Sequence, residues 1–489
     1  MQLSPGHYST NVTVCLQAPE AISQVQLLVQ ELRRITLLWD ELWLGTLVQH
    51  HAEISRRLQQ LELEVLRVED NASLSSADKD RLIAEKHRII LKPLVFILEQ
   101  LHAITSVPPE TPHEKWFQEK FGEYITDALH KLKTSWNPRR PQESWQPLKQ
   151  LQSRLQQRAQ KRSAYTIHMM DISPALAGLK DSLIAMPGVT SRSGTIITVS
   201  AVDNNIAILP TKTKPKKLVF HGSDGQLYTY LFKGLEDLHL DERIMQFLSI
   251  ANTMMQRSSS TSESMYRARH YSVIPLGPRS GLISWVDGVT PLFGLYKRWQ
   301  QRETATVSLR GGQSSTSVQG GNGPGQVMRP SELFYSRLTP LLKERGISNL
   351  DNRKEWPLPI LRQVLTDLMD ETPKDLLAKE LWCHSVNAGS WWQTTRTYSY
   401  SVAVMSIIGY IIGLGDRHLD NVLVDLLTGE VVHIDYNVCF EKGKTLRVPE
   451  KVPFRMTPNI RTALGVTGVE VSVTLVGVSC FLLGCSYII

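Results

Sequence analysis

The sequence has few cysteines, and none of them lies in a metal-binding pair. Five cysteines are spread over 489 residues, and no two are separated by just two residues. This distribution argues against a disulfide framework and against a structural zinc site. The N-terminal segment, residues 1–23, opens without the basic cluster and apolar run of a secretory signal peptide. We therefore expect a protein of the cytoplasm or of the nucleus.

Two familiar nucleotide-binding signatures are also missing. The pattern GxxxxGK[ST] does not occur, which argues against a P-loop enzyme. The glycine-rich run Gly320–Gly325 follows no predicted strand and opens no predicted helix, so we interpret it as linker. The formal charge of +7 and the pI of about 9.0 permit an anionic partner without specifying one.

Residues 24–165 have apolar side chains at three- and four-residue spacing, which is typical of amphipathic helices. The predicted helices contain Ile35–Leu47, Ser75–Leu101, a third segment that begins at Thr111, and Trp145–Leu155. At the third, Thr-Pro-His-Glu offers a capping hydroxyl, a proline in the first turn and a reciprocal carboxylate. Four such helices with short links favour an antiparallel bundle.

The last predicted helices of this region are strongly basic. Nine lysines and arginines lie between Lys131 and Arg162, against one acid, Glu143. We favour a solvated helix face, because aromatic side chains are not interleaved with the charge. A contact with RNA or another anion through this face is the alternative.

From residue 196 the pattern changes to short β-branched runs, of which Leu218–His221 and Gln226–Phe232 are joined by a hairpin signal. A helix is predicted over Asp237–Met255. Residues 303–329 are rich in glycine, serine and glutamine, and we predict a flexible insertion there.

The strongest chemical signal lies in residues 413–435. A predicted buried helix ends at a glycine-bracketed loop that carries Asp416, His418 and Asn421. A short hairpin follows and returns a second carboxylate, Asp435, to the same place. Phosphoryl transfer uses such a set: one carboxylate orients the attacking hydroxyl, while an amide and a second carboxylate hold the metal ion that bridges the phosphates.

This segment resembles the phosphatidylinositol-3-kinase-like superfamily, whose catalytic loop reads Asp-Arg-His-x-x-Asn and whose metal loop begins His-Ile-Asp. The resemblance implies a bilobal kinase domain of the PI3K/PI4K type that uses ATP with Mg²⁺ or Mn²⁺. It implies that Asp416 is the catalytic base or hydroxyl-orienting group and that His418 is a proton or transition-state partner. Asn421 and Asp435 would be the metal ligands.

A lysine in the β-rich region extends the resemblance. Lys233 ends an alternating strand, where a lysine is often a solvated rim residue, but the segment that it opens matches the lysine segment of the superfamily. The resemblance implies that Lys233 pairs with the ATP phosphates and that Glu236 or Asp241 holds it. The residues implied to touch phosphate from the covering loop are Thr211 and Lys212.

The expected adenine site lies at the end of the β-rich region. Residues 281–286 resemble the hinge of the superfamily, so Trp285 would stack on the base and the Val286 backbone would pair with its edge. A tryptophan at this position could equally be plain core. The other nucleotide contacts that the resemblance implies are Leu231, Ile283, Leu423 and Ile434.

Two further segments resemble the PI3K-related protein kinases rather than the lipid kinases. They are Val448–Thr457, at the end of the activation loop, and Leu38–Trp43, which resembles the start of a rapamycin-binding (FRB) type of bundle. Residues 435–444 look most like the branch that acts in nonsense-mediated mRNA decay. This branch implies phosphorylation of Ser-Gln or Thr-Gln sites, chiefly on the RNA helicase of that pathway.

We therefore predict an α+β protein with a four-helix FRB-like bundle followed by a bilobal kinase domain. The predicted parts are the bundle at 24–165, a β-rich N-lobe with its hinge at 166–286, and an incomplete helical C-lobe at 287–470. An active serine/threonine kinase is the first hypothesis. The alternative is a non-catalytic remnant that binds nucleotide or partners without turnover.

The apolar segment 471–489 contains nineteen residues without a charge. It could be a membrane anchor, a fragment of buried core or an unrelated continuation of the chain. The missing basic flank argues against attachment to a membrane. Because the similarity ends at Glu470, we expect poor solubility and little turnover from this chain alone.

Overall fold

The computed structural model describes residues 19–468, apart from 135–136, 138, 162–164, 190–193, 212, 259–265, 311–329, 348–352, 447 and 453. The chain forms two compact units. The first contains Met1–His239 and Ser272–Trp285, and the second contains Leu240–Tyr271 and Val286–Ile489. Helices dominate both units and each has its own antiparallel sheet, so the predicted α+β class is confirmed. The predicted segment 471–489 and Lys212 lie outside the described residues.

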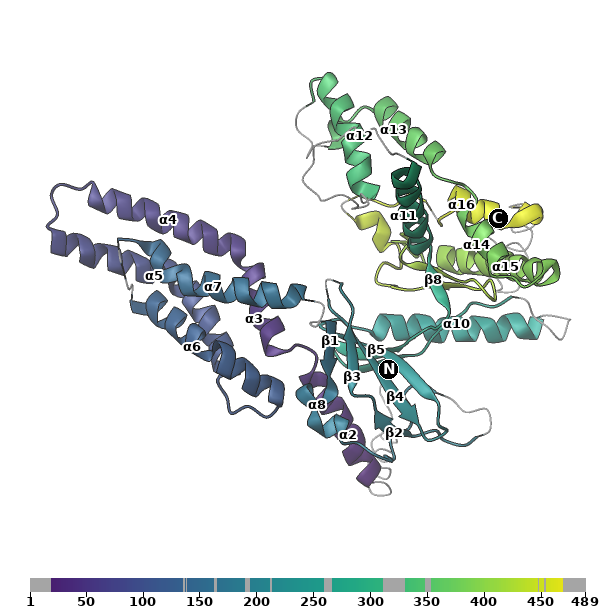
Figure 1. Ribbon diagram of the computed structural model, residues 1–489, viewed down its shortest axis with the longest axis horizontal. Coiled ribbons are helices and arrows are strands. Elements are labelled where there is room, and N and C mark those ends of the chain that lie inside the picture. The colour runs from purple at the N-terminus through teal and green to yellow at the C-terminus, as the bar shows by residue number, and fades with distance from the viewer. Residues whose placement is uncertain are drawn as a thin grey trace, which may run out of the picture. The chain divides into compact units, whose positions relative to one another are not determined.

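The first unit begins with helices that pack lengthwise as a bundle (Figure 1). They are α3 (Trp39–Gln49), α4 (His51–Glu69), α5 (Ser76–Thr105), α6 (Pro112–Thr134) and α7 (Pro141–Gln160). Their apolar stripes meet in one core that includes Trp43, Phe117 and Trp145. The predicted cap of α6 forms: the Glu114 amide donates to the Thr111 hydroxyl at 3.2 Å, and the Thr111 amide donates to the Glu114 carboxylate at 3.3 Å.

The first predicted bundle helix is wrong in its extent. The chain is extended at Leu38, which separates α2 (Pro19–Arg34) from α3. Ile35 and Leu38 pack with the neighbouring sheet instead of the bundle core. The apolar spacing was read correctly, but it runs across this break because the residues on either side serve two different cores.

The sheet of the first unit has the order β1-β3-β4-β5-β7-β6, and β2 also pairs with β4. Its strands are β1 (Thr166–His168), β2 (Val199–Val202), β3 (Asn205–Ile208), β4 (Lys216–Gly222), β5 (Leu227–Gly234), β6 (Val273–Gly277) and β7 (Ser280–Ser284), with short helices α8 (Met169–Ile172) and α9 (Pro174–Ala177) after β1. The predicted hairpin is β4–β5, which turns at Gly225 with φ of +76°.

A buried ion pair joins this sheet to the bundle. The Lys216 ammonium on β4 lies 3.1 Å from the Glu41 carboxylate, in the first turn of α3, and 3.3 Å from the Thr36 carbonyl. Glu41 also accepts a hydrogen bond from the Leu38 amide at 3.1 Å, which caps α3. Lys216 is only 2% exposed, so its charge depends on these partners.

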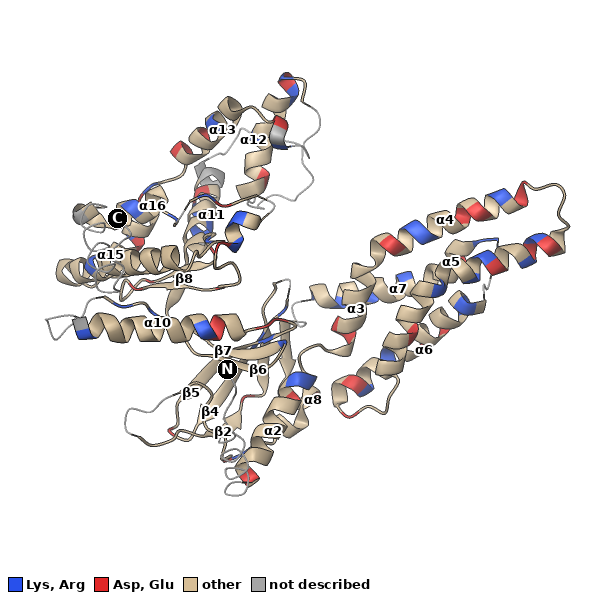
Figure 2. Ribbon diagram, turned by 180° about the vertical axis from the view of Figure 1, so that it is seen from behind, with Lys and Arg blue, Asp and Glu red and all other residues tan. Residues whose placement is uncertain are grey.

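The second unit is mainly helical, with a small sheet of order β10-β9-β8. Its strands are β8 (Val289–Pro291), β9 (Val422–Asp425) and β10 (Val431–His433), and its helices are α10 (His239–Ser258, of which His239 belongs to the first unit), α11 (Leu292–Arg310), α12 (Pro330–Glu344), α13 (Leu358–Glu371), α14 (Leu376–Cys383), α15 (Ala388–Ile411) and α16 (Pro458–Ala463), with single 3₁₀ turns at Arg353–Glu355, Lys442–Thr445 and Gly465–Thr467. Figure 2 shows α15 almost free of charged residues, as the predicted core helix requires.

The predicted flexible insertion begins too early. Residues 303–310 continue α11, and only 311–329 lie outside the described residues. The hydroxyls of Thr304 and Thr306 bond back to carbonyls one turn earlier, at 2.9 Å each, which is how a threonine inside a helix can satisfy its hydroxyl. Within the described ranges, no helix is both long and apolar enough to cross a bilayer.

Candidate active site

The loop after α15 is shaped by a glycine. Gly413 has φ of +57°, and a Cβ on it would lie 2.8 Å from the Glu441 amide nitrogen, so a larger residue would not fit. The Leu414 amide bonds to the Gly409 carbonyl at 2.8 Å and ends the helix. The chain then enters the segment with the predicted catalytic residues.

Asp416 and Asn421 are held together by a direct hydrogen bond. The Asn421 side-chain nitrogen donates to the Asp416 carbonyl at 3.0 Å, and the Asn421 amide donates to the His418 carbonyl at 2.9 Å. Asn421 is buried, whereas His418 is exposed. Because the bond uses the nitrogen of the Asn421 side chain, its oxygen is the atom left to offer a cation.

The β9–β10 hairpin returns the chain to this loop, as predicted. Val422 pairs with His433, and the Ile434 amide donates to the Asn421 carbonyl at 3.1 Å. Asp435 therefore follows directly after a residue bonded to the catalytic loop. Its carboxylate accepts a 3.3 Å hydrogen bond from the Asn437 amide.

Arg417 joins the two loops from beneath. Its guanidinium donates to the Gly415 carbonyl at 2.9 Å, to the Ile434 carbonyl at 2.8 Å and to the Asp435 carbonyl. Burial lowers the pKa of Arg417, while the nearby Tyr436, Asp435 and Asp416 oppose that shift. A guanidinium stays charged in proteins, so this cation holds both loops in place and its positive charge balances the negative charges of Asp416 and Asp435.

The residue after Asp435 is a tyrosine that lies in the core. Tyr436 is fully buried, and its amide donates to the Asp241 carboxylate at 3.3 Å. Burial raises the pKa of its phenol well above the usual value. Among the described residues the Tyr436 hydroxyl has no hydrogen-bond partner.

These residues suit a magnesium or manganese ion shared with phosphates. The described residues contain no group of three histidine, cysteine, aspartate or glutamate side chains that could hold a metal alone. Mg²⁺ is commonly bound through one or two carboxylates together with substrate phosphates, because it gives up its water reluctantly. Asp435 and the Asn421 oxygen are the groups of this chain that would bind it.

In the first unit, four predicted nucleotide contacts share one face of the sheet. Leu231 pairs with Ile283 and Lys233 pairs with Gly281, and paired residues lie on the same face. Trp285 continues the alternation of β7 and is anchored by its amide, which bonds to the Thr229 carbonyl at 2.9 Å. Three of the residues that alternate with them point into the core and are at most 1% exposed: Tyr230, Phe232 and Leu282.

Lys233 pairs with an acid on the segment that follows its strand. Its ammonium lies 3.0 Å from the Glu236 carboxylate, and both side chains are about one-fifth exposed. Of the two acids predicted to hold it, Glu236 makes this pair, while Asp241 belongs to the second unit and binds the Tyr436 amide.

The remaining predicted contacts are spread over both units. Thr211 lies in the loop between β3 and β4, where its carbonyl accepts from the Lys214 amide at 3.2 Å. The Lys217 ammonium lies 4.3 Å from the centre of the Trp285 ring, so this ring packs against a cation as well as the sheet. In the second unit Leu423 is buried on β9, and Val286 and Ile434 are half-buried.

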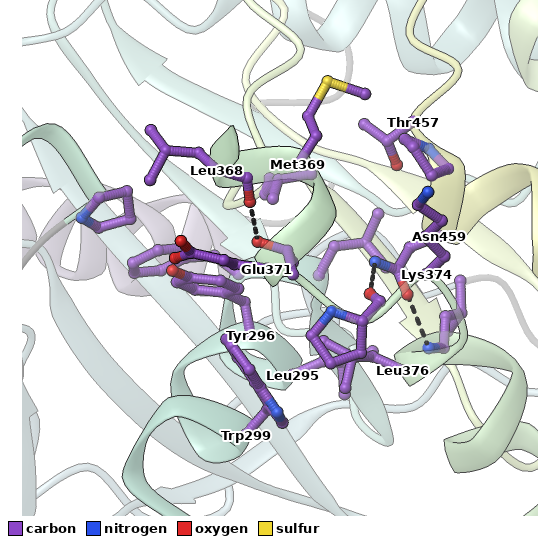
Figure 3. Close-up of a pocket in the computed structure, with 18 of the residues that line it drawn as sticks. Leu295, Tyr296, Trp299, Leu368, Met369, Glu371, Lys374, Leu376, Thr457 and Asn459 are labelled. Carbon is purple, nitrogen blue, oxygen red and sulfur yellow. Dashed lines mark hydrogen bonds between the residues drawn. The ribbon is translucent and has the colours of Figure 1, made fainter. Parts of the chain in front are cut away.

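A separate apolar pocket of about 400 Å³ lies beside the catalytic loop in the second unit. Figure 3 shows Tyr296 and Trp299 of α11 facing Leu368 and Met369 of α13 across it. Leu419 of the catalytic loop also lines the pocket, but none of the predicted site residues does. Two of the lining residues are joined by a hydrogen bond, because the Asn459 side chain donates to the Pro373 carbonyl at 2.8 Å.

Sequence reasoning missed two residues of this site. Arg417 lies inside the recognised motif, yet only the structure shows that its guanidinium spans both loops. Glu450 was read only as part of a family segment, although its carboxylate accepts the Asp416 amide at 2.9 Å. Asp416 and Glu450 are 34 positions apart, too far for any local periodicity to signal this contact.

The chain is similar to known protein kinases in sequence. The family model described as phosphatidylinositol 3- and 4-kinase matches residues 227–482, which is more than half of the chain and runs past Glu470. "Serine/threonine-protein kinase SMG1" of Danio rerio is 59% identical over 452 residues, and "Serine/threonine-protein kinase Smg1" of Drosophila melanogaster is 47% identical over 476 residues. These alignments cover 92% and 97% of this chain, but 12% and 14% of the relatives.

The solved structures agree at the level of the fold. The structure titled "FAT and kinase domain of CtTel1" matches with a TM-score of 0.51 and 19% identity, over 87% of this chain and 30% of that one. At this identity the match shows a shared fold, while the family model and the sequence relatives carry the family assignment. The chain belongs to the phosphatidylinositol 3- and 4-kinase family, and the two relatives from Danio rerio and Drosophila melanogaster are named as serine/threonine-protein kinases.

Proposed function

We propose that this chain is the catalytic portion of an ATP-dependent serine/threonine protein kinase. Asp416 would orient the hydroxyl of the substrate, and Asn421 with Asp435 would hold a magnesium or manganese ion. Lys233, kept in place by Glu236, would bind the ATP phosphates. When bound, the nucleotide would supply the phosphoryl group, and the metal ion would neutralise the charge on its oxygens.

One observation carries the proposal. The Arg417 guanidinium binds carbonyls of both the Asp416 loop and the Asp435 loop. A purely structural hairpin does not need a buried cation under two aspartates, whereas a site that gathers metal and phosphate needs a fixed distance between its ligands.

For the substrate we propose Ser-Gln or Thr-Gln sites on the RNA helicase of nonsense-mediated mRNA decay. The support is the resemblance of residues 435–444 to the branch of that pathway, together with relatives named SMG1. The preference can be tested on synthetic peptides that differ only in the residue after the serine.

The decisive experiment measures transfer of labelled phosphate from Mg-ATP to a Ser-Gln peptide. The unmodified chain should transfer phosphate measurably, even at the low rate expected from its sequence, and Asp435→Ala should abolish transfer. Asp420→Asn is the matched control, because Asp420 lies exposed in the same loop and has no predicted role. A rise in melting temperature with Mg-ATP but no transfer would contradict the kinase proposal and favour a nucleotide-binding remnant.

A further inference from the structure

Asp416 has an unusual backbone conformation that requires support. Its φ is +55°, in the left-handed region that residues with a Cβ rarely occupy. The conformation of this residue sets where its carboxylate can lie. Contacts to its backbone therefore bear directly on the geometry of the proposed reaction.

Glu450 supplies such a contact. Both oxygens of its carboxylate accept the Asp416 amide, at 2.9 and 3.1 Å. The acceptor is charged, which makes this bond stronger than one to a neutral group. Glu450 thus satisfies the backbone donor of the residue whose side chain is proposed to orient the substrate.

Two glycines make room for this carboxylate. A Cβ on Gly415 would overlap a Glu450 oxygen, and a Cβ on Gly443 would lie 3.0 Å from the same oxygen. The Glu450 amide in turn donates to the Gly443 carbonyl at 3.0 Å. The glutamate is therefore enclosed by backbone on both sides and anchored through its own main chain.

Arg455 provides another contact between the segment that holds Glu450 and the catalytic loop. The Arg455 guanidinium donates to the Arg417 carbonyl at 3.0 Å, and Arg417 itself is buried beneath the loop. The segment that contains Glu450 is therefore tied to the catalytic loop through both Glu450 and Arg455.

We propose that Glu450 is a positioning residue for the reaction: it holds the amide of Asp416 and thereby links the end of the activation segment to the catalytic loop. This inference rests on the proposed function for its catalytic meaning. The contact itself is independent of turnover, and the two can be tested separately.

The first test is amide hydrogen exchange in the full chain, resolved at Asp416 by overlapping peptides. Glu450→Ala should speed exchange of this amide about tenfold or more, since it loses a hydrogen bond to a charged acceptor. Glu450→Gln keeps one acceptor oxygen and should restore most of the protection. Glu441→Ala is the control, because Glu441 pairs with Lys444 on an exposed turn of the same segment.

Exchange in the buried helix α15 serves as the check on folding. Faster exchange at Asp416 in Glu450→Ala, with α15 unchanged, would support the inference. Unchanged exchange at Asp416 would overturn it, whatever the activity. Equal acceleration throughout α15 would also overturn it, because Glu450 would then act on general stability.

The second test is kinetic. Glu450→Ala should lower kcat about tenfold and leave the KM for ATP within twofold, with Glu450→Gln intermediate. A fall in kcat that matches the change in exchange would support positioning, whereas normal kcat despite faster exchange would refute it. No turnover in the unmodified chain would count against the proposed function, and the exchange experiment would still decide whether Glu450 holds Asp416.

Discussion

The side-chain nitrogen of Asn421 donates a 3.0 Å hydrogen bond to the carbonyl of Asp416, five residues earlier. This bond closes the catalytic loop on itself and assigns the two ends of the Asn421 side chain to different tasks. The nitrogen holds the loop, and the oxygen is the proposed ligand of the metal ion. Loss of either function should therefore be separable by substitution.

We expect Asn421→Asp to keep a metal-binding oxygen but to lose the bond to the Asp416 carbonyl. Activity should fall by a factor of about 10² or more, because a loop that misplaces a reacting group loses its geometric advantage. The concentration of Mg²⁺ that gives half-maximal rate should change little. A large increase in that concentration with normal kcat would mean that Asn421 acts only as a ligand.

The Lys233–Glu236 pair gives a graded prediction. Lys233→Met should remove the thermal stabilisation that Mg-ATP provides, while Glu236→Gln should weaken it only in part. The reason is that the ammonium binds phosphate directly and the carboxylate, 3.0 Å away, only orients it. Melting curves with and without Mg-ATP measure the effect. Equal losses in both variants would show that the pair acts as a structural unit.

Two turn glycines form a matched pair for stability. Gly225 has φ of +76° and open space where a Cβ would lie, so Gly225→Ala should cost about 1 kcal/mol of backbone strain. Gly429 has φ of +84°, and a Cβ there would overlap the Thr394 carbonyl. Gly429→Ala should therefore cost about 3 kcal/mol or more. Urea unfolding would show the difference, and similar midpoints would contradict the packing argument.

Tyr436→Phe should leave stability unchanged or raise it by about 1 kcal/mol, because it removes a buried hydroxyl that lacks a partner among the described residues. Tyr398→Phe is the control, since the buried Tyr398 hydroxyl donates to the Ile460 carbonyl at 3.3 Å. That variant should lose about 1 kcal/mol. A comparable loss in Tyr436→Phe would indicate a hydrogen bond to water at that position.

The turn of the β9–β10 hairpin should be sensitive to acid. Burial alone would raise the pKa of Asp425, but its hydrogen bonds to Arg269 at 2.7 Å and to the Thr428 and Leu427 amides lower it overall. A lowered folded-state pKa stabilises the protein above the ordinary value of 3.8, and this contribution is lost as the pH falls through the folded pKa.

The unmodified chain should therefore lose more stability than Asp425→Asn between pH 5 and the acid limit of folding, as measured by melting temperature. Asp370→Asn is the control, because Asp370 makes only a long, exposed pair with Lys374 at 3.5 Å. Parallel pH profiles for the unmodified chain and Asp425→Asn would argue against the pairing with Arg269.

Local features of the fold were the most predictable from sequence. The Thr111 cap, the β4–β5 hairpin and the core helix that precedes the catalytic loop each depend on neighbours within a few residues. The packing of Ile35 with the sheet could not be predicted, because amphipathic spacing shows that a face is buried but not which surface covers it.

The basic face of the bundle illustrates the same limit. Residues 131–162 contain one acid in sequence, but acidic side chains from other helices pair with several of their cations in the structure. Arg139 pairs with Asp80 at 2.7 Å, Lys133 pairs with Glu99 at 2.5 Å, and Arg158 pairs with Asp40 at 3.3 Å. Cations that are paired with acids in this way give little support to an RNA-binding face. The contact with RNA or another anion stays a prediction.

In the site, motif spacing was enough to predict that the loop with Asp416 and Asn421 lies next to the loop with Asp435. It could not supply the supports beneath them. Arg417 and Glu450 act through backbone carbonyls and amides, and such groups are the same at every position in a sequence. Only the tertiary path of the chain reveals which of them a side chain will reach.

The buried ion pair between Lys216 of β4 and Glu41 of α3 limits how far the bundle can move relative to the sheet. Separating α3 from the sheet would remove Glu41 from the buried Lys216 ammonium, and the loss of one partner of a buried ion pair costs several kcal/mol. The bundle and the sheet should consequently move as one rigid piece. A partner that binds the bundle helices would then also restrain β5, the strand that carries Lys233.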